Sequence, residues 1–229
     1  MMLDSIVIEE DSSIERRASL HRALGDETRL AIIDALWTGD HTPAQLRGVT
    51  GIQSNLVAFH LDVLEQAGLI SRRGSQGDGR RRYVTLEPSA VPFVAPVASL
   101  AVECVLFVCT HNAARSQFAA ALWSRRTGSD AVSAGTRPAD RVHPHAVAVA
   151  ADHGLDLSGA LPRHLADVEV TPDLVISVCD RANEAGLSFD VARRHWSIPD
   201  PLGDDRRSFE AAYQAIADRI DRLAMERAA

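Results

Sequence analysis

Cys109 and Arg115 lie six positions apart in the stretch VLFVCTHNAARSQFAAALW (residues 105–123). The apolar run before Cys109 predicts a buried strand, and the residues from Ser116 onward predict a helix. A strand–loop–helix directs successive backbone N–H groups and the positive end of the helix dipole at one point, where a tetrahedral oxyanion can bind. Arg115 can grip two oxygens of that anion as a fork, and the same field favours the thiolate form of Cys109. The spacing predicts a nucleophile beneath a bound oxyanion.

The loop between these two elements supplies the rest of the expected site. Ser116 can donate a hydrogen bond to the sulfur, and Asn112 can hold the shape of the loop. Most lone cysteines are small buried apolar residues, and we interpret Cys104, on the same strand, in that way. For Cys109, the strand that precedes it and the helix that follows it favour a catalytic role over that of a buried apolar residue. The predicted substrate-binding residues are Thr110, His111, Asn112, Ala113, Ala114, Arg115 and Ser116.

The residues that follow predict the elements that position this loop. Short apolar strands at 132–138 and 172–179 alternate with a helix that begins near His143 and is capped by Gly154, and a long helix closes the chain from Arg206. This alternation is typical of an α/β domain with a parallel sheet. The chemistry also requires a carboxylic acid to protonate the oxygen that leaves. Asp200, in the loop 194–205, is the candidate, although Asp-Pro also forms simple turns.

Together the stretches CTHNAARSQ, SAGTRP, HPHAVAVAADHGLDLS, VISVCD and HWSIPDP resemble the low-molecular-weight protein tyrosine phosphatase fold, specifically its arsenate reductase branch. The resemblance runs from about Glu103 to the C-terminus. It implies that Cys109 is the nucleophile, Arg115 the anion-binding arginine and Asp200 the general acid. Phosphotyrosine enzymes of this fold usually carry aromatic residues after Asp-Pro, whereas this chain has Leu202-Gly203, which favours arsenate over phosphotyrosine.

Phosphate and arsenate share shape and charge, so the step after the first attack must distinguish the two reactions. Water hydrolyses a cysteinyl-phosphate, whereas a second thiol breaks a cysteinyl-arsenate and releases arsenite. In the thioredoxin-coupled reductases that this chain resembles, two more cysteines lie at Cys179 and seven residues beyond, where this chain has Gly186. Either Cys179 forms a disulfide with Cys109, or a low-molecular-weight thiol attacks the adduct. We expect no bound cofactor or metal, and an external reductant: a low-molecular-weight thiol with a glutaredoxin-like protein, or thioredoxin.

The first part of the chain predicts a different function. Helical patterns at 14–24, from Asp26, at 43–50 and at about 54–67 precede two short strands around a Gly-rich turn at 74–79. This order is typical of a winged helix-turn-helix, whose helix from Ser54 would enter the major groove while the arginines of the wing meet phosphates. The predicted DNA-binding residues are Gln53, Ser54, Asn55, His60, Arg72, Arg73, Arg80, Arg81 and Arg82.

LGDETRLAIIDAL and HLDVLEQAGLISRRGSQGDGRRRYVTL resemble the ArsR-type winged-helix repressors, over about residues 14–87. The resemblance implies a homodimer, formed through this domain, that binds a double-stranded DNA operator. Arsenic-sensing members carry a Cys-x-Cys pair on the third helix, but TPAQLRGVTG contains no such ligand. Trivalent arsenic requires soft thiolates, so we expect no sensing at that site.

Composition and length set the remaining limits. The 229 residues carry a net charge of −7, so any basic surface must be local. Three cysteines, and an N-terminus without a signal-peptide pattern or a spanning apolar segment, favour a cytoplasmic protein. We expect a winged-helix domain at 1–87, a Pro/Ala/Val-rich linker at 88–102 and an α/β domain at 103–229. Pro88, Pro92 and Pro96 are expected to oppose helix and central strand within the linker.

The leading interpretation is a transcriptional regulator fused to an arsenate reductase. One alternative is a phosphatase that acts on phosphotyrosine or small phosphoesters and needs no thiol. The other is a repressor whose anion site binds an oxyanion without catalysis and reports it to the DNA-binding half.

Overall fold

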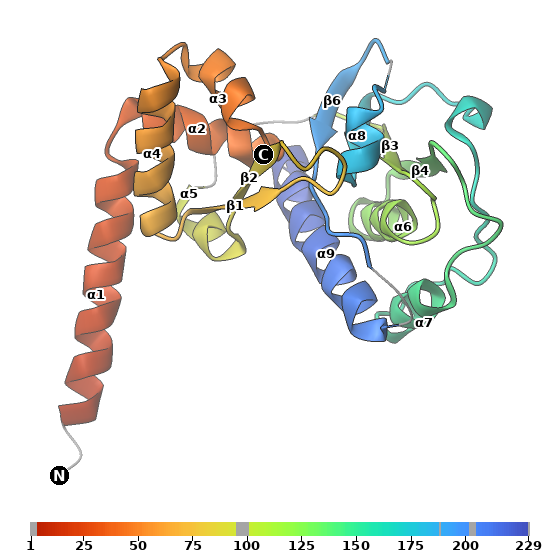
Figure 1. Cartoon of the computed structure of the whole chain (residues 1–229). Helices are drawn as coiled ribbons and strands as arrows, with labels where there is room; N and C mark the ends of the chain where they lie inside the picture. Colours follow the sequence, from red (N-terminus) through yellow and green to blue (C-terminus); the bar gives the residue numbers. More distant parts are fainter. Residues whose placement is uncertain (1–3, 95–100, 188, 202–204, 229) are drawn as a thin grey trace. The chain divides into compact units, whose positions relative to one another are not determined.

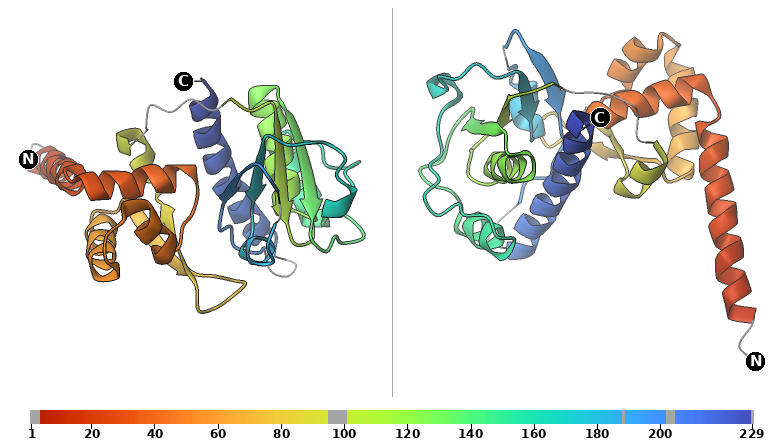
Figure 2. Two further views of the ribbon diagram at one scale, coloured as in Figure 1. Left: turned by 90° about the horizontal axis from the view of Figure 1, so that it is seen from above. Right: turned by 180° about the vertical axis from the view of Figure 1, so that it is seen from behind.

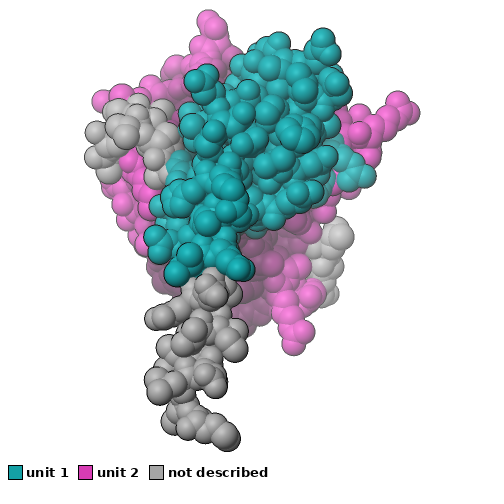
Figure 3. Space-filling model, turned by 90° about the vertical axis from the view of Figure 1, so that its left-hand side faces the viewer, with its two compact units in different colours: residues 1–73, 82–96 teal, residues 74–81, 97–229 magenta. Residues whose placement is uncertain are grey.

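The computed structural model describes residues 4–94, 101–187, 189–201 and 205–228. These residues form two compact units, each described by itself (Figure 3). Unit 1 comprises residues 1–73 and 82–96, and unit 2 comprises residues 74–81 and 97–229. None of the helices in the described ranges combines the length and the apolar character that crossing a bilayer requires.

The first elements of unit 1 are four helices and a two-stranded sheet (Figure 1). They are α1 (Asp4–Leu24), α2 (Glu27–Thr38), α3 (Pro43–Thr50), α4 (Ser54–Gln66), β1 (Ile70–Gly74) and β2 (Arg82–Leu86). The four predicted helices are confirmed, and the first begins earlier than the sequence pattern indicated. The expectation of a helical first half is therefore correct.

Local side-chain chemistry sets the boundaries of these helices. The carboxylate of Asp26 caps α2 by accepting a hydrogen bond from Arg29 N–H at 3.0 Å. Thr42 and Gln45 form a reciprocal capping box at the start of α3. Gly51, with φ +70°, ends α3, and Gly68 follows α4 with the same φ. The core of unit 1 includes Val57, Leu61 and Leu64 of α4, which recur at helical spacing.

Part of the expected linker is folded. Pro88–Ala90 forms a 3-10 turn, η1, and α5 (Val91–Val94) follows it directly. The expectation that Pro88 and Pro92 would oppose helix is therefore wrong. Both prolines lie in the first turn of their element, where the backbone N–H has no helical partner. Ala90 and Val94 are buried in the core of unit 1. Pro96 lies outside the described residues.

Unit 2 is built on a parallel sheet in the order β4-β3-β5-β6 (Figure 2). The strands are β3 (Cys104–Cys109), β4 (Asp130–Gly135), β5 (Leu174–Ser177) and β6 (Ala192–His195). The helices are α6 (Arg115–Thr127), α7 (Pro144–Asp152), α8 (Asp180–Glu184) and α9 (Arg206–Ala228), and Leu165–Asp167 forms a 3-10 turn, η2. Helix α6 packs on β3 and β4, and α9 packs against α6 and α7. The predicted parallel α/β domain is confirmed, whereas β6 and α8 were not expected.

The core of unit 2 explains why β3 is a central strand. Val105, Leu106, Phe107 and Val108 are all fully buried between β4 and β5. A parallel strand covered on both faces reads as a continuous apolar run, and this one does. Burial of the whole strand fixes its C-terminal end, where Cys109 begins the loop.

Candidate active site

The loop after β3 holds the sulfur of Cys109 in a set of hydrogen bonds. Cys109 ends β3 opposite Gly135 of β4 and is 2% exposed. Asn112 N–H donates to Cys109 Sγ at 3.1 Å, and the hydroxyl of Ser116 lies 3.1 Å from the same sulfur. The loop thus directs a backbone N–H and a side-chain hydroxyl at the same sulfur.

The side chain of Asn112 organises this loop. Its amide Nδ2 donates to Ser116 Oγ at 2.8 Å, and its Oδ1 accepts from Arg163 N–H at 2.9 Å. Gln117 Nε2 donates to the same Oδ1 at 3.2 Å. Because Ser116 Oγ accepts from Asn112, the hydroxyl proton of Ser116 is available for the sulfur. Asn112 also adopts φ +50°, a left-handed conformation that asparagine tolerates better than most residues.

Close approach of the neighbouring strand requires a glycine. A Cβ atom on Gly135 would lie 2.8 Å from the carbonyl oxygen of Thr110 and 3.1 Å from Cβ of Asn112. Backbone hydrogen bonds tie the two segments together: Thr136 N–H donates to Cys109 O and Arg137 N–H to Thr110 O. Gly135 thus lets β4 support the loop directly.

The guanidinium of Arg115 is buried, 5% exposed, and already oriented. Nη1 donates to the carbonyl of Ile198 at 3.0 Å, and Nη2 donates to Asp200 Oδ1 at 2.6 Å. The structure therefore brings together Cys109, Arg115 and Asp200, although Asp200 lies 85 residues beyond Arg115. Leu202 and Gly203 lie outside the described residues.

These groups surround a cavity of about 110 Å³. It is lined by Cys109, His111, Ala113, Ala114, Arg115, His143, Asp200, Pro201 and Phe209. A water molecule occupies roughly 30 Å³ in the liquid, so the cavity can hold a group of several heavy atoms. Among the predicted substrate-binding residues, Thr110, Asn112 and Ser116 are buried and support the loop from behind. His111, Ala113, Ala114 and Arg115 line the cavity itself.

Two aromatic residues of the lining were missed by sequence reasoning. His143 and Phe209 stack with ring centroids 4.4 Å apart. His143 Nδ1 accepts from His145 N–H at 3.2 Å, so the neutral imidazole carries its proton on Nε2. The signal was present in HPH, because a histidine before proline can cap a helix, but the pattern was used only to predict α7.

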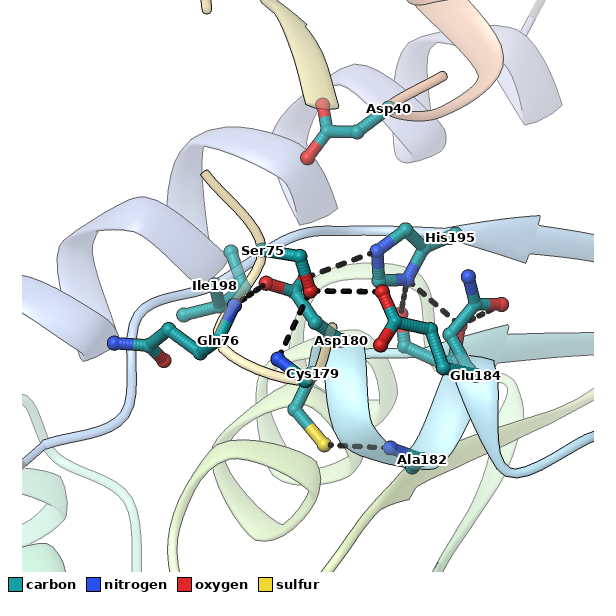
Figure 4. A network of polar contacts seen from close by, with 12 residues as sticks. Asp40, Ser75, Gln76, Cys179, Asp180, Ala182, Glu184, His195 and Ile198 are labelled. Atoms are coloured by element: carbon teal, nitrogen blue, oxygen red, sulfur yellow. Dashed lines mark hydrogen bonds and ion pairs between the residues drawn. The ribbon is translucent and has the colours of Figure 1, made fainter. Parts of the chain in front are cut away.

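Gln76 is a third residue that the sequence did not indicate. Residues 74–81 group with unit 2, and there the side chain of Gln76 accepts a hydrogen bond from Asp200 N–H at 2.6 Å. Its own N–H donates to Asp180 Oδ2 at 2.8 Å (Figure 4). Gln76 therefore links the segment that carries Asp200 to the start of α8.

Next to Cys179, Asp180 forms a buried polar cluster with His195 (Figure 4). His195 Nε2 lies 3.2 Å from Asp180 Oδ1, and His195 Nδ1 lies 2.9 Å from Ser177 Oγ. Burial acts to raise the pKa of Asp180, but hydrogen bonds from His195, Ser197 and the Gln76 backbone outweigh it and lower that pKa. The cluster stabilises the ionised carboxylate at the N-terminus of α8.

Cys179 lies beside the loop that begins at Cys109. Its sulfur lies 3.4 Å from Thr110 Oγ1 and accepts from Ala182 N–H at 3.4 Å. Burial raises the pKa of Cys179, and Cys109 adds to that shift, whereas Arg115 and the contact with Thr110 oppose it. Cys179 is therefore poorly ionised at neutral pH. Seven residues later Gly186 has φ +83°, a backbone conformation that a cysteine would rarely adopt.

Cys104 lies at the start of β3 and is half-buried, away from the loop. Burial raises the pKa of Cys104, and the carboxylates of Asp173 and Asp130 add to that effect. All three cysteines are free thiols. Among the described residues, no group of histidine, cysteine and carboxylate side chains could hold a metal ion.

The predicted DNA-contacting residues of α4 differ in exposure. Gln53, Ser54 and Asn55, at the N-terminal end of the helix, are exposed. His60 is half-buried, and its Nδ1 lies 3.7 Å from the carboxylate of Asp26. The first three residues present polar groups to solvent, whereas His60 faces α2.

The five predicted DNA-binding arginines fall into two groups: three lie near carboxylates and two do not. Arg72 donates to Glu65 and to Asp62, and Arg73 lies 3.7 Å from Asp40. Arg81 lies 3.5 Å from Asp78. Arg80 and Arg82 are exposed, and neither side chain forms an ion pair with the residues that the structure describes. The carboxylates thus hold the guanidinium of Arg72, which we leave out of the proposed phosphate contacts.

Comparison with known proteins identifies relatives of unit 2. The family model described as low molecular weight phosphotyrosine protein phosphatase matches residues 104–228. An arsenate reductase of Bacillus cereus (strain AH187) is 31% identical over 124 residues, covering 52% of this chain and 92% of that protein. Arsenate reductase 1 of Staphylococcus epidermidis is 30% identical over 129 residues, covering 52% and 94%. The solved structure of an arsenate reductase from Archaeoglobus fulgidus is 33% identical, with a TM-score of 0.48, and covers 53% of this chain and 99% of that one.

Proposed function

Because the chain belongs to the low molecular weight phosphotyrosine protein phosphatase family, we propose that unit 2 is a thiol-dependent arsenate reductase and that unit 1 is a DNA-binding regulatory domain. The observation that carries the enzymatic part is the position of Cys109. Its sulfur accepts a hydrogen bond from Asn112 N–H. Cys109 and Arg115 line the same cavity. The relatives at 30–31% identity that are named arsenate reductases support the choice of substrate.

Binding and attack use the groups that line this cavity. Arg115 and the N–H groups of the loop hold the arsenate oxygens, while the thiolate of Cys109 attacks arsenic and forms the S–As bond. One As–O bond breaks, and the departing oxygen takes a proton from Asp200 and leaves as water.

A thiol must then resolve the adduct. A thiolate attacks Cys109 Sγ, the two electrons of the S–As bond pass to arsenic, and arsenite leaves as a disulfide forms on Cys109. Cys179 is the internal candidate for this thiol, because its sulfur adjoins Thr110 of the same loop. With Gly186 in place of a third cysteine, an external thiol reductant or thioredoxin must restore Cys109.

One experiment separates the main candidates. Purified protein is given arsenate with glutathione plus a glutaredoxin, or with thioredoxin, and arsenite is measured; the same sample is tested for aryl phosphate hydrolysis without any thiol. Arsenite formation that requires both arsenate and a thiol supports the reductase. Steady aryl phosphate turnover with no arsenite from any donor would instead assign unit 2 as a phosphatase.

The phosphatase alternative remains the second candidate for a specific reason. The cavity is formed by a cysteine, an arginine and a carboxylate, and it presents no feature that distinguishes arsenic from phosphorus. The phosphoenzyme would be hydrolysed by water, and Cys179 would then be dispensable. If unit 2 is a reductase, Cys179→Ser is expected to reduce arsenite formation with thioredoxin. If unit 2 is a phosphatase, the same variant is expected to leave aryl phosphate hydrolysis unchanged.

For unit 1 we propose a winged helix-turn-helix that binds an operator as a homodimer. The short α3, the exposed polar start of α4 and the two-stranded sheet support this arrangement. We assign Gln53, Ser54 and Asn55 to base edges, and Arg82 together with Arg80, in the segment 74–81 that groups with unit 2, to phosphates. Selection of DNA fragments by the full chain, followed by footprinting, tests binding; no retention of any duplex at low salt would refute it.

Regulation through the oxyanion is the third candidate function. In that case arsenate or phosphate bound in the Cys109 cavity changes DNA affinity without chemistry, and Cys109→Ser retains the response. If arsenite is the signal instead, the same variant loses a response to arsenate but keeps one to added arsenite. The three free thiols fit a reducing compartment, and we place both activities in the cytoplasm.

A further inference from the structure

A second hollow adjoins the Cys109 cavity. It has a volume of about 410 Å³, within the ~300–1,000 Å³ range of small-molecule sites. It is lined by His111, Ala113, Ala139, Arg141, His143, Pro144 and His145. Three of these residues, His111, Ala113 and His143, also line the cavity above the sulfur. A molecule in the hollow therefore has direct access to the reaction centre.

The chemistry of the lining favours an anion. The hollow carries one guanidinium and three imidazoles, and no carboxylate lines it. Arg141 is exposed, and its side chain makes no ion pair with the residues that the structure describes. Arg115, by contrast, is held by Ile198 and Asp200. A free guanidinium with imidazole donors beside it is suited to a carboxylate, which it can bind as a fork.

The proposed reaction lacks one participant that this hollow can supply. Gly186 stands where the relay of the resembled reductases has its third cysteine, and Cys179 is buried with its sulfur hydrogen-bonded. A thiol from solution that attacks the adduct on Cys109 must enter from the open side of the loop. His111 and Ala113 form that side and belong to both spaces.

We propose that the hollow lined by Arg141, His143 and His145 binds the carboxylates of a small-molecule thiol and directs its sulfur at Cys109. This inference rests on the proposed reductase function and names the co-substrate site of that reaction. The site accepts a peptide-sized thiol with at least one carboxylate, and it discriminates against neutral thiols of the same reactivity.

The chemical step balances with this thiol, RSH. The arsenate adduct on Cys109, with one oxygen protonated, reacts with RSH: the S–As bond breaks, an S–S bond forms between Cys109 and the thiol, and the thiol proton goes to the released arsenite. Arsenic gains two electrons, and each of the two sulfurs loses one. A second thiol then attacks the mixed disulfide, regenerates Cys109 and leaves as the disulfide of the small molecule.

A test that needs no arsenate uses the mixed disulfide alone. The full chain is treated with oxidised glutathione, which carries carboxylates, or with the neutral bis(2-hydroxyethyl) disulfide, and modification at Cys109 is followed by peptide mass spectrometry. Arg141→Ala is expected to slow the glutathione reaction about five- to twentyfold, because an exposed contact between the guanidinium and a carboxylate is lost, and to change the neutral reaction less than about twofold.

The matched control is Arg137→Ala. Arg137 is also an exposed arginine of the segment after β4, but it does not line the hollow. It is expected to change neither reaction. An equal effect of Arg141→Ala on both disulfides, no effect on either, or an equal effect of the Arg137 variant would overturn the proposal.

Steady-state kinetics with arsenate distinguish a failure of the proposed thiol site from a failure of the proposed reductase function. With arsenate, Arg141→Ala is expected to raise the KM for glutathione about five- to twentyfold and to leave the KM values for 2-mercaptoethanol and for arsenate unchanged. If no thiol yields arsenite while the disulfide preference for negative charge persists, the reductase function fails and the site stands. If Arg141→Ala impairs only a carboxylated aryl phosphate, the hollow holds the leaving group of a phosphoester and the thiol proposal fails.

Discussion

Arginines lie in two different environments in this chain. Arg115 in unit 2 is 5% exposed and is held by a backbone carbonyl and a carboxylate before any anion arrives. Arg80 and Arg82, which follow the Gly-rich turn, are exposed and have no ion-pair partner within the described ranges. A small oxyanion in a cavity requires donors fixed in advance, because reorganisation would weaken transition-state stabilisation. A polyanion along a solvated surface is bound by mobile charges that displace counterions.

The largest expected effect tests the fixed site at its centre. Cys109→Ser keeps the size of the side chain and the hydrogen bonds of the loop but removes the nucleophile. We expect arsenite formation to fall by roughly 10⁴-fold or more, since no other group can form the covalent intermediate. Initial rates with saturating thiol measure the effect, and binding of phosphate by calorimetry serves as the control for an intact loop. Activity within tenfold of the original chain would contradict covalent catalysis by Cys109.

Arg115→Lys tests whether arsenate turnover depends on the two-pronged geometry of the guanidinium or only on its positive charge. Lysine retains the positive charge but cannot bind two oxygens in one plane. We expect kcat/KM for arsenate to fall about 10²- to 10³-fold, the range for loss of one donor to a developing oxyanion. The matched variant Arg80→Lys changes an exposed arginine in the same way and is expected to leave the turnover of arsenate unaltered. Similar rates for both lysine variants would show that charge alone is sufficient in unit 2.

The stability of unit 2 is expected to depend on pH through Asp180, a second buried charge that is fixed by hydrogen bonds in advance, like Arg115. The fold lowers the pKa of Asp180 below its ordinary value of 3.8, so folding favours the ionised carboxylate. Its stabilisation is complete above the ordinary carboxyl range and is lost as the pH falls through the lowered pKa. We expect Asp180→Asn to destabilise unit 2 by about 2–4 kcal/mol near pH 7, as expected when a buried, hydrogen-bonded charge is replaced.

The measurement follows unit 2 alone. In a Trp37→Phe background, only Trp123 and Trp196 report, and both are buried in unit 2. The difference in melting temperature between Asp180 and its asparagine variant is expected to be constant from about pH 6 to 7 and to shrink below about pH 4. A difference that does not change with pH would show that Asp180 acts by shape rather than by charge.

The smallest expected effect concerns the exposed arginines. Replacing both Arg80 and Arg82 by alanine is expected to weaken DNA binding to all sequences alike, and to reduce the slope of log K against log salt by about 2, or about 0.9 for each phosphate contact. Fluorescence anisotropy at several salt concentrations gives the slope. Arg72→Ala serves as the comparison, because Glu65 and Asp62 already hold that guanidinium; a larger loss of slope in the Arg72 variant would reverse the assignment.

The sequence predicted well the features that depend on neighbours within a few residues. The apolar run 105–108, the loop Cys109–Ser116 and the start of α6 follow one another directly, and their hydrogen bonds close within seven residues. The capping box of Thr42 and Gln45 and the terminal Gly51 are local in the same way. The prediction of η1 and α5 failed because the prolines were interpreted without their position in the first turn.

What the sequence alone determined is the order of strand, loop and helix and the local shape that presents the Cys109 sulfur, because these elements are consecutive and each is favoured by its own residues. Only the tertiary structure decided what surrounds them. It joined Asp200 and Ile198 to Arg115, Arg163 to Asn112 and Gln76 to Asp200, pairs separated by 51 to 124 residues. It also created the hollow beside Arg141. Such contacts depend on how whole elements pack, and no periodicity along the chain encodes which distant side chains packing will bring together.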